Sequence, residues 1–312
     1  MSNGSSSSSN LDFKGRVAIV TGAGGGLGRQ HALALAARGA KVVVNDLGGA
    51  RDGSGGSVSA AQAVVDEIKA AGGEAIANGA SVTDFEAVQA MVKKAVDAWG
   101  RVDILVNNAG ILRDKSFAKM DLADFRLVVD VHLMGAVNCT KAVWALMNEQ
   151  KYGRIVMTTS SSGLYGNFGQ SNYGAAKLAL VGLMQTLSIE GAKNDIRVNC
   201  LAPTAATRMT EDLFPKEMLE AFRPEAVVPA MLVLAAQDAP NRTILCAGAG
   251  TFEAAHITLT QGVWLGIDAD TPEQLAARLS EVTQREGEAV PQSGTAQGAN
   301  EVAKGMANAK RG

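Results

Sequence analysis

The sequence predicts an α/β fold: a parallel, doubly wound sheet with helices on both faces, in a single domain. Short runs rich in valine and isoleucine alternate with longer helical segments along the chain, an order typical of parallel strands joined by helical crossovers. A glycine-rich turn joins the first strand to the first helix. The 312 residues, 47% hydrophobic and 19% charged, suffice to bury a substantial core.

The first predicted unit is a strand, a glycine-rich turn and a helix. Residues 16–20 form a short apolar run, and residues 29–38 an alanine- and leucine-rich helix that Gly39 closes. The turn between them reads Thr21-Gly-Ala-Gly-Gly-Gly-Leu-Gly28. Its glycines let the backbone approach a pyrophosphate, whose charge the free N–H groups at the helix start stabilise. A merely flexible loop is disfavoured because strand and helix flank it.

The second predicted strand, residues 41–45, ends at Asp46. An acid at this place can accept hydrogen bonds from the adenosine ribose. It suits the 2′-hydroxyl of NAD and repels the 2′-phosphate of NADP, so we expect NAD. Two alternatives remain open: an Asp after a strand is a common turn former, and Arg51 in the glycine-rich loop 47–57 could meet a phosphate. We discount Arg51 because the position of that loop cannot be inferred.

The later elements continue the alternation of strands and helices. In chain order they are expected at residues 74–78, 84–99, 102–106, 121–148, 154–158, 171–193, 197–200 and 243–246. Residues 204–223 mix apolar and charged side chains and follow a strand, so we expect a lid over an apolar substrate, with a packed amphipathic helix as the alternative.

Both ends of the chain are too polar to pack. We expect a disordered tail over residues 1–11, the domain over 12–285 and a mobile tail over 286–312.

Three polar side chains near the middle of the chain can act on one reacting carbon. Tyr173 and Lys177 are four residues apart on a predicted helix and therefore share one face. A lysine charge near a phenol favours its ionised form, which makes the phenol a usable proton carrier. Ser160 follows the apolar run 153–159 and presents its hydroxyl where that strand ends. Each feature alone is common by chance, and their combination with the glycine turn is not.

The combined spacing resembles the short-chain dehydrogenase/reductase superfamily, which has a Rossmann fold, over about residues 12–265. The residues that carry it are Thr21-Gly22-x-x-x-Gly26-x-Gly28, Asn107-Asn108-Ala109-Gly110, Ser160 and Tyr173-x-x-x-Lys177. More narrowly, several segments are similar to the dehydrogenase module of peroxisomal multifunctional enzymes of type 2. These segments are 45–49, 111–117, 130–132, 164–170 and 201–203.

The resemblance implies a role for each residue of the motif. Tyr173 would be the acid/base, Lys177 would lower the pKa of the phenol and bind the nicotinamide ribose, and Ser160 would hold the substrate oxygen. Asn107 would support the sheet near the cofactor. The similar modules oxidise (3R)-3-hydroxyacyl-CoA and in some members 17β-hydroxysteroids, so an acyl-CoA is the favoured substrate and a steroid the alternative. A non-catalytic NAD-binding regulator is disfavoured by the intact Ser160, Tyr173 and Lys177.

The same resemblance assigns the cofactor-binding residues. Those expected to hold NAD are Gly22, Gly24, Gly26, Leu27, Gly28, Asp46, Ser81, Val82, Asn108, Ala109, Gly110, Tyr173, Lys177 and Pro203. Where many relatives have an Asn whose backbone helps to hold a relay water, this chain has His132. We place His132 among the catalytic candidates, with a core histidine as the alternative. Ala80 stands where relatives often have an adenine-contacting Asp, so contacts from Ser81 and Val82 would use backbone groups.

Composition argues against several classes of partner. The net charge is −2 and no basic stripe is present, so nucleic acid is not expected. No run of 18 apolar residues and no secretory signal occur, so we expect a cytoplasmic protein without a membrane partner. The last residues are not Ser-Lys-Leu, so peroxisomal import by that signal is not expected.

The remaining predictions concern thiols, metals and assembly. Cys139, Cys200 and Cys246 lie in apolar segments without metal or disulfide spacing, so we expect buried free thiols and no metal. The helix 171–193 carries several small residues, and by resemblance it would join subunits into a homodimer or homotetramer.

Overall fold

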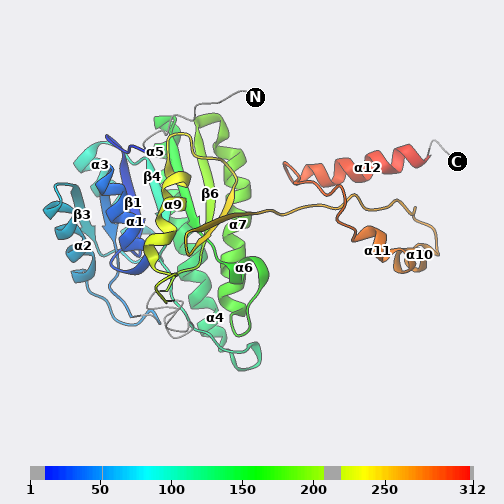
Figure 1. Cartoon of the computed structure of the whole chain (residues 1–312), viewed down its shortest axis with the longest axis horizontal. Helices are drawn as coiled ribbons and strands as arrows, with labels where there is room; N and C mark the ends of the chain where they lie inside the picture. Colours follow the sequence, from blue (N-terminus) through cyan, green and yellow to red (C-terminus); the bar gives the residue numbers. More distant parts are fainter. Residues whose placement is uncertain (1–10, 51, 207–218, 310–312) are drawn as a thin grey trace. The chain divides into compact units, whose positions relative to one another are not determined.

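The computed structural model describes residues 11–50, 52–206 and 219–309 (Figure 1). The chain divides into two compact units, Met1–Ala254 and Ala255–Gly312. The predicted N-terminal tail up to residue 10, Arg51, and residues 207–218 of the predicted lid lie outside the described residues.

One eight-stranded sheet organises the first unit. Its order is β3-β2-β1-β4-β5-β6-β7-β8, and every pair from β3 to β7 is parallel. The strands are β1 (Val17–Thr21), β2 (Lys41–Asn45), β3 (Glu74–Asn78), β4 (Ile104–Asn107), β5 (Gly153–Thr158), β6 (Ile196–Pro203), β7 (Ile244–Gly248) and β8 (Thr251–Ala255). This order confirms the predicted doubly wound sheet. It reverses between β1 and β4, and ligands of such sheets bind beyond the carboxyl ends of the strands at that point.

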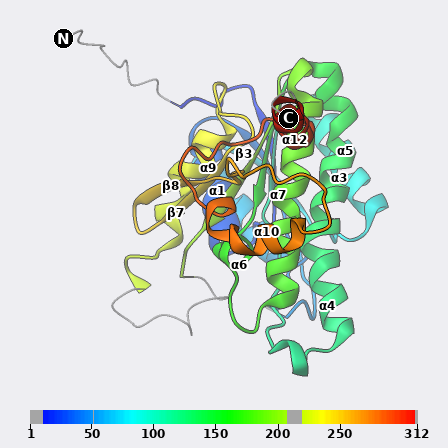
Figure 2. The same ribbon diagram turned by 90° about the vertical axis from the view of Figure 1, so that its right-hand side faces the viewer.

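Helices cover both faces of this sheet. Helices α1 and α9 pack together on one face, and on the other α3 packs with α5 and α4 with α7 (Figure 2). The α-helices of the first unit are α1 (Gly26–Ala37), α2 (Ser59–Ala70), α3 (Phe85–Trp99), α4 (Leu122–Val129), α5 (Gly135–Gln150), α6 (Ser161–Tyr165), α7 (Ser171–Gly191) and α9 (Val228–Ala235). Helices α2, α6 and α9 and strand β8 go beyond the predicted elements. No helix in the described part of the chain is both long and apolar enough to cross a membrane.

The central strands form the core, as their valine- and isoleucine-rich sequences require. Every residue of β1, β4 and β5 is buried, because helices cover both sides of a parallel sheet. Ile19, Leu105 and Ile155 have no exposed surface.

Local signals set the helix ends. The Asp84 carboxylate accepts a hydrogen bond from the main-chain N–H of Ala87 at 3.0 Å and starts α3, and Gly100, at φ 77°, ends it. Helix α1 differs, because Gly25 precedes it and supplies no capping side chain. The first N–H groups of α1 therefore point into the glycine-rich turn without a side-chain acceptor.

The predicted helix 121–148 is divided by a π-turn. Residues Asp130–Met134 form one π-helical turn between α4 and α5, a feature often found at functional sites. His132 lies in this turn and is buried.

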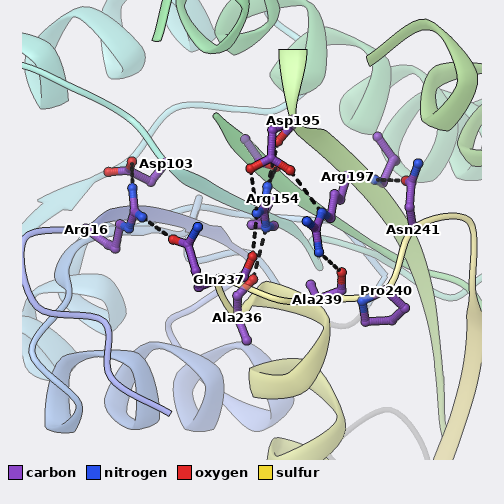
Figure 3. A network of polar contacts seen from close by, with 12 residues as sticks. Arg16, Asp103, Arg154, Asp195, Arg197, Ala236, Gln237, Ala239, Pro240 and Asn241 are labelled. Carbon is purple, nitrogen blue, oxygen red and sulfur yellow. Dashed lines mark hydrogen bonds and ion pairs between the residues drawn. The ribbon is translucent and has the colours of Figure 1, made fainter. Parts of the chain in front are cut away.

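A fully buried arginine ties the amino end of β5 to its neighbours (Figure 3). Arg154 directs all five of its N–H donors at acceptors. The acceptors are the main-chain oxygens of Ala236, Gly153, Asp195 and Gln237 and the carboxylate of Asp195. Because every donor has a partner, the buried charge joins β5, β6 and the end of α9 without an uncompensated desolvation cost.

An aromatic ring extends this cluster toward β1. The guanidinium carbons of Arg16 and Arg154 lie 3.7 Å and 4.1 Å from the centroid of the Tyr152 ring. Arg16 also pairs with the buried carboxylate of Asp103 at 3.0 Å. The cluster stands at the amino ends of the strands, opposite the end where a ligand would bind.

The second unit has no core of its own. None of its described side chains is buried between residues 255 and 308. It contains α10 (Thr271–Ala277), α11 (Leu279–Val282) and α12 (Thr295–Ala309). The division after Ala254 comes earlier than the boundary expected at residue 285, and α12 occupies part of the expected tail 286–312. The polar composition of this segment indicated a tail. Val302 and Met306 nevertheless have helical spacing, four residues apart on α12, and both are exposed.

The three cysteines are free. Cys139 and Cys200 are buried as expected, and burial raises the pKa of the Cys139 thiol to about 12. Cys246 was expected to be buried but is partly exposed, since it lies on β7, beside the exposed strand β8.

We predict that Arg154→Met lowers the free energy of unfolding by about 3 kcal/mol or more, because it leaves several buried carbonyl oxygens without donors. Urea unfolding measures this. Arg197→Met is the matched control, because Arg197 also pairs with Asp195 but is 33% exposed. Equal losses in both variants would contradict the role given to Arg154.

We predict that His31 makes the free energy of unfolding sensitive to acid. Neither ring nitrogen has a partner among the described residues, and burial lowers its pKa from 6.5 to about 4. The unfolded chain binds that proton at higher pH than the folded chain does, so the free energy of unfolding falls as the pH drops from about 6.5 toward 4, by about 3 kcal/mol. His31→Leu should flatten this slope in urea unfolding, whereas the exposed His256→Leu should not. Parallel slopes for His31→Leu and the unmodified protein would rule out this origin.

Candidate active site

The glycine-rich turn lies where β1 ends, in close contact with two neighbouring loops. A Cβ added at Gly22 would lie 2.8 Å from the Cα of Ala109, and one added at Gly24 would lie 2.9 Å from Oδ2 of Asp46. A Cβ added at Gly28 would overlap the main-chain oxygen of Gly22. These glycines are therefore required by close backbone approach, as in turns that cradle a pyrophosphate.

The start of α1 can stabilise an anion. Gly26 and Leu27 begin the helix, Gly25 gives it no side-chain cap, and its first turn carries no acidic residue. The free N–H groups and the positive end of a 12-residue helix therefore meet no acidic side chain of that turn. Together with the glycine cradle, this arrangement fits a dinucleotide pyrophosphate.

Asp46 stands directly after β2, beside the turn. Its Oδ2 accepts a hydrogen bond from the Gly24 N–H at 2.7 Å and its Oδ1 one from the Gly48 N–H at 2.6 Å. Each carboxylate oxygen keeps a further lone pair, so the side chain is oriented and can still accept hydrogen bonds from a ribose.

Thr21 holds the Asn107-Asn108-Ala109-Gly110 turn against the glycine-rich turn. Its Oγ1 accepts hydrogen bonds from the N–H groups of Asn108 and Ala109, both at 3.0 Å. The Asn108 amide in return donates to the main-chain oxygens of Thr21 and Gly22, at 2.9 Å and 3.1 Å. Both turns thus form one polar floor at the point where the strand order reverses.

Asn107 and Gly110 fill the space below this floor. The Asn107 amide donates to Oγ1 of Thr140 at 3.1 Å, and its Oδ1 has no partner among the described residues. A Cβ added at Gly110 would overlap the His132 ring, so a glycine is needed there.

On the adenine side, Ser81 and Val82 follow β3. The main-chain oxygen of Val82 already accepts a hydrogen bond from the Asn138 amide, and that of Ala80 one from the Asn45 amide, both at 2.9 Å. These bonds fix the loop and occupy part of the backbone expected to face the adenine.

Ser160 lies just beyond the carboxyl end of β5, and Pro203 is the last residue of β6. Ser160 is 8% exposed, and its Oγ accepts a hydrogen bond from the Ser162 N–H at 3.2 Å, which starts α6. Its hydroxyl also acts on the phenol of Tyr173, whose pKa it lowers. The predicted convergence of these two residues is therefore present.

Tyr173 and Lys177 share one face of α7. The Lys177 Nζ lies 5.5 Å from the centroid of the Tyr173 ring and donates to the main-chain oxygen of Thr158 at 2.6 Å. The Thr159 hydroxyl donates to the main-chain oxygen of Lys177 at 2.6 Å. These bonds hold α7 against the end of β5 and bring the amine and the phenol together.

The predicted depression of the Tyr173 pKa by Lys177 is not what the structure shows. Burial raises the pKa of Tyr173, the Ser160 hydrogen bond opposes this, and the Asp114 carboxylate adds to it. Burial also lowers the pKa of Lys177 to about 7, so this amine is not a full positive charge at neutral pH. The expectation counted only the favourable charge and neglected the loss of water around both groups.

His132 is a buried neutral histidine in contact with the phenol. Its ring meets that of Tyr173 edge-on, with centroids 5.1 Å apart and planes at 89°. Nε2 lies 2.8 Å from the Ile111 carbonyl oxygen, and burial and Lys177 hold the pKa of His132 well below its ordinary value. The main-chain N–H of Ile111 also donates to Nε2, at 3.1 Å, so both polar groups of Ile111 face this nitrogen, and Nδ1 has no partner among the described residues.

Sequence patterns did not reveal the main-chain partners of the site. Thr158 contributes a carbonyl oxygen to Lys177, and a carbonyl leaves no trace in a side-chain pattern. Asn172, next to Tyr173, has no exposed surface, and its amide donates to the main-chain oxygen of Arg113 at 3.0 Å. The described residues contain no group of three His, Cys, Asp or Glu arranged to hold a metal.

Comparison with known proteins agrees with this geometry. The chain is 48% identical over 284 residues to peroxisomal multifunctional enzyme A of Dictyostelium discoideum, which covers 91% of this chain and 63% of that protein. The structure of full-length peroxisomal multifunctional enzyme type 2 from Drosophila melanogaster matches with a TM-score of 0.80 and 38% identity, covering 97% of this chain and 51% of that chain. The chain thus spans only part of these two relatives.

A smaller enzyme matches as well. A 7α-hydroxysteroid dehydrogenase complexed with NADH and 7-oxo glycochenodeoxycholic acid matches with a TM-score of 0.70 and 31% identity, covering 77% of this chain and 96% of that one. The family model described as short chain dehydrogenase matches residues 16–218. These findings confirm the resemblance inferred from the motifs. The chain belongs to the short chain dehydrogenase family.

Proposed function

We propose that this oxidoreductase is an NAD-dependent dehydrogenase of secondary alcohols whose favoured substrate is a (3R)-3-hydroxyacyl-CoA. The observation that carries the proposal is the convergence of Ser160, Tyr173 and Lys177 beside the glycine-rich turn. The similarity to peroxisomal multifunctional enzymes supports the acyl-CoA substrate.

The three polar side chains divide the work at the reacting carbon. Ser160 holds the substrate oxygen by a hydrogen bond, and the Tyr173 hydroxyl takes the proton of the alcohol or returns it to the ketone. Lys177 orients the nicotinamide ribose by hydrogen bonds. A bound nicotinamide accepts or supplies the hydride. Because the pKa of Tyr173 is raised, its phenol carries a proton at neutral pH, which suits ketone reduction, and alcohol oxidation should gain from higher pH.

The choice of NAD rests on Asp46. Its carboxylate stands at the end of β2, held by two main-chain N–H groups, where the 2′-oxygen of the adenosine ribose would lie. A carboxylate accepts hydrogen bonds from a hydroxyl and repels a phosphate. The related hydroxysteroid dehydrogenase whose structure contains NADH supports a nicotinamide cofactor.

A bulky hydroxysteroid is the second candidate substrate. Tyr165 and Phe168 are 73% and 90% exposed and lie between Ser160 and Tyr173 in the sequence, so a large apolar ligand has rings to pack against. Following NADH at 340 nm with (3R)-3-hydroxyacyl-CoA and with hydroxysteroids separates the two. A preference for the steroid would replace the acyl-CoA proposal.

We also propose that the protein is a cytoplasmic homodimer or homotetramer joined through α7. Leu178 and Ile189 on this helix are 45% and 52% exposed, and a Cβ added at Gly182, on the same face, would meet no neighbour. Light scattering after size exclusion tests the assembly, and a monomer would contradict it.

The peroxisomal relatives make cell fractionation the test of location, and peroxisomal enrichment would contradict the proposed cytoplasmic location.

We predict that Tyr173→Phe lowers turnover by about 10²- to 10⁴-fold, as expected for a lost general acid/base, while NADH still binds. Stopped assays measure the turnover, and NADH fluorescence measures the binding of the cofactor. Tyr152→Phe is the control, since it removes a hydroxyl from a second tyrosine whose ring stacks between Arg16 and Arg154. Turnover that survives Tyr173→Phe would exclude the phenol from the reaction.

We predict that Asp46→Ala weakens NAD binding and reduces the preference for NAD over NADP by about tenfold, the value of one charge-assisted hydrogen bond. The ratio of kcat/KM for the two cofactors measures it. Asp66→Ala, on an exposed part of α2, should leave the ratio unchanged. An unaltered ratio in Asp46→Ala would show that another residue reads the ribose.

A further inference from the structure

The segment of residues 111–115, here named the bridge segment, follows the Asn107–Gly110 turn and makes contacts in two directions. Toward the loop of residues 47–57, the Nε–H of Arg113 donates to the main-chain oxygen of Asp52 at 2.9 Å. Toward α4, Nη1 of the same guanidinium pairs with Asp124 at 2.6 Å. One side chain therefore joins two elements that are distant in the sequence.

The loop 47–57 begins directly after Asp46, the residue that we assign to the adenosine ribose. Residues 52–57 are all exposed, so few packed side chains hold the loop in place. The loop also approaches the bridge segment at Gly53, where an added Cβ would lie 3.3 Å from the Ile111 side chain. Both contacts come from the bridge segment.

The bridge segment is also bonded to the residues just before the phenol. The fully buried Asn172 amide donates to the Arg113 oxygen at 3.0 Å, and the Asn172 Oδ1 accepts from the Tyr173 N–H at 2.7 Å. Two further bonds run parallel. Gln170 donates to Asp114 at 2.7 Å, and the Lys115 N–H donates to the Gly169 oxygen at 2.9 Å.

We propose that Arg113 is a positioning residue that ties the loop 47–57 at the adenosine ribose to the start of α7, so that dinucleotide binding at Asp46 also fixes Tyr173. The inference rests on the proposed function, because it takes Asp46 and Tyr173 as the ribose-binding and proton-transferring residues. It adds a residue outside the cofactor-binding and catalytic sets assigned above. Its main chain holds Asn172, and its side chain holds the loop.

The chemistry of the side chain explains why an arginine stands there. A guanidinium offers N–H donors in a fixed planar fork, so it can bond to Asp52 and Asp124 at the same time. The Asp124 carboxylate is 17% exposed, which limits screening of the pair by solvent. A lysine carries the charge on a single nitrogen and cannot hold both acceptors in this geometry.

The test combines NADH binding with hydrogen exchange and steady-state kinetics of the whole chain. In the unmodified protein, NADH should slow amide exchange both in residues 47–57 and in residues 169–175. In Arg113→Ala, NADH should still protect the glycine-rich turn but no longer residues 169–175. The Kd for NADH should rise about 3- to 10-fold, the effect of one hydrogen bond, and kcat at saturating cofactor should fall at least about 3-fold because the phenol is less well placed.

Two further variants separate bridging from charge and from general damage. Lys115→Ala removes a neighbouring cation, 3.8 Å from the same Asp124, and should stay within about twofold of the unmodified protein in Kd and kcat. Arg113→Lys keeps the charge beside Asp124 and the folded state, yet should lose the long-range protection as Arg113→Ala does. If Arg113→Ala does not fold, Arg113→Lys decides the question.

The outcomes distinguish this inference from the proposed function. If NADH binds the unmodified protein and residues 169–175 are equally protected in Arg113→Lys, the coupling is overturned and the dehydrogenase proposal stands. If NADH does not bind the unmodified protein, both are overturned. The role assigned to Arg113 is supported if residues 169–175 lose their protection in the two Arg113 variants and keep it in Lys115→Ala and in the unmodified protein.

Discussion

The active site depends on the hydrogen bonds between Thr21 and the Asn107–Gly110 turn. The Thr21 hydroxyl accepts from two successive N–H groups, and the Asn108 amide returns two bonds to the chain around Gly22. These bonds lie where β1 and β4 are neighbours and the strand order reverses. They hold the glycine-rich turn and the Asn107–Gly110 turn together, so the side chains of the candidate site keep their positions relative to both turns.

Burial controls the electrostatics at this site. It raises the pKa of Tyr173 and lowers that of Lys177, so it disfavours the charged form of each. The Ser160 hydroxyl works against this tendency at the phenol. The proton transfer proposed for Tyr173 would therefore depend on polar contacts that the folded chain already provides, such as the one with Ser160.

The sequence predicted those parts of the structure that depend on local pattern. Valine-rich strands, the glycine-rich turn and the spacing of Tyr173 and Lys177 follow from periodicity, and the structure contains them in the expected order. The sequence could not predict features that depend on main-chain hydrogen-bond partners or on how deeply an ionisable group is buried. The five donors of Arg154 end mostly on carbonyl oxygens, and the Lys177 pKa is set by surrounding atoms from several elements. The boundary after Ala254 was missed because residues 255–285 have an ordinary composition while burying no side chain.

The π-turn at Asp130–Met134 constrains how the length of this chain can vary. A π-turn contains one residue more than an α-helical turn needs, and each residue rotates a helix by about 100°. Deleting a single residue there would restore a regular helix but rotate α5 relative to α4, which would turn Thr140, Val143 and Met147 away from the sheet. A change of one in residue number is therefore incompatible with the fold, and an alignment of relatives should carry no gap at these five positions.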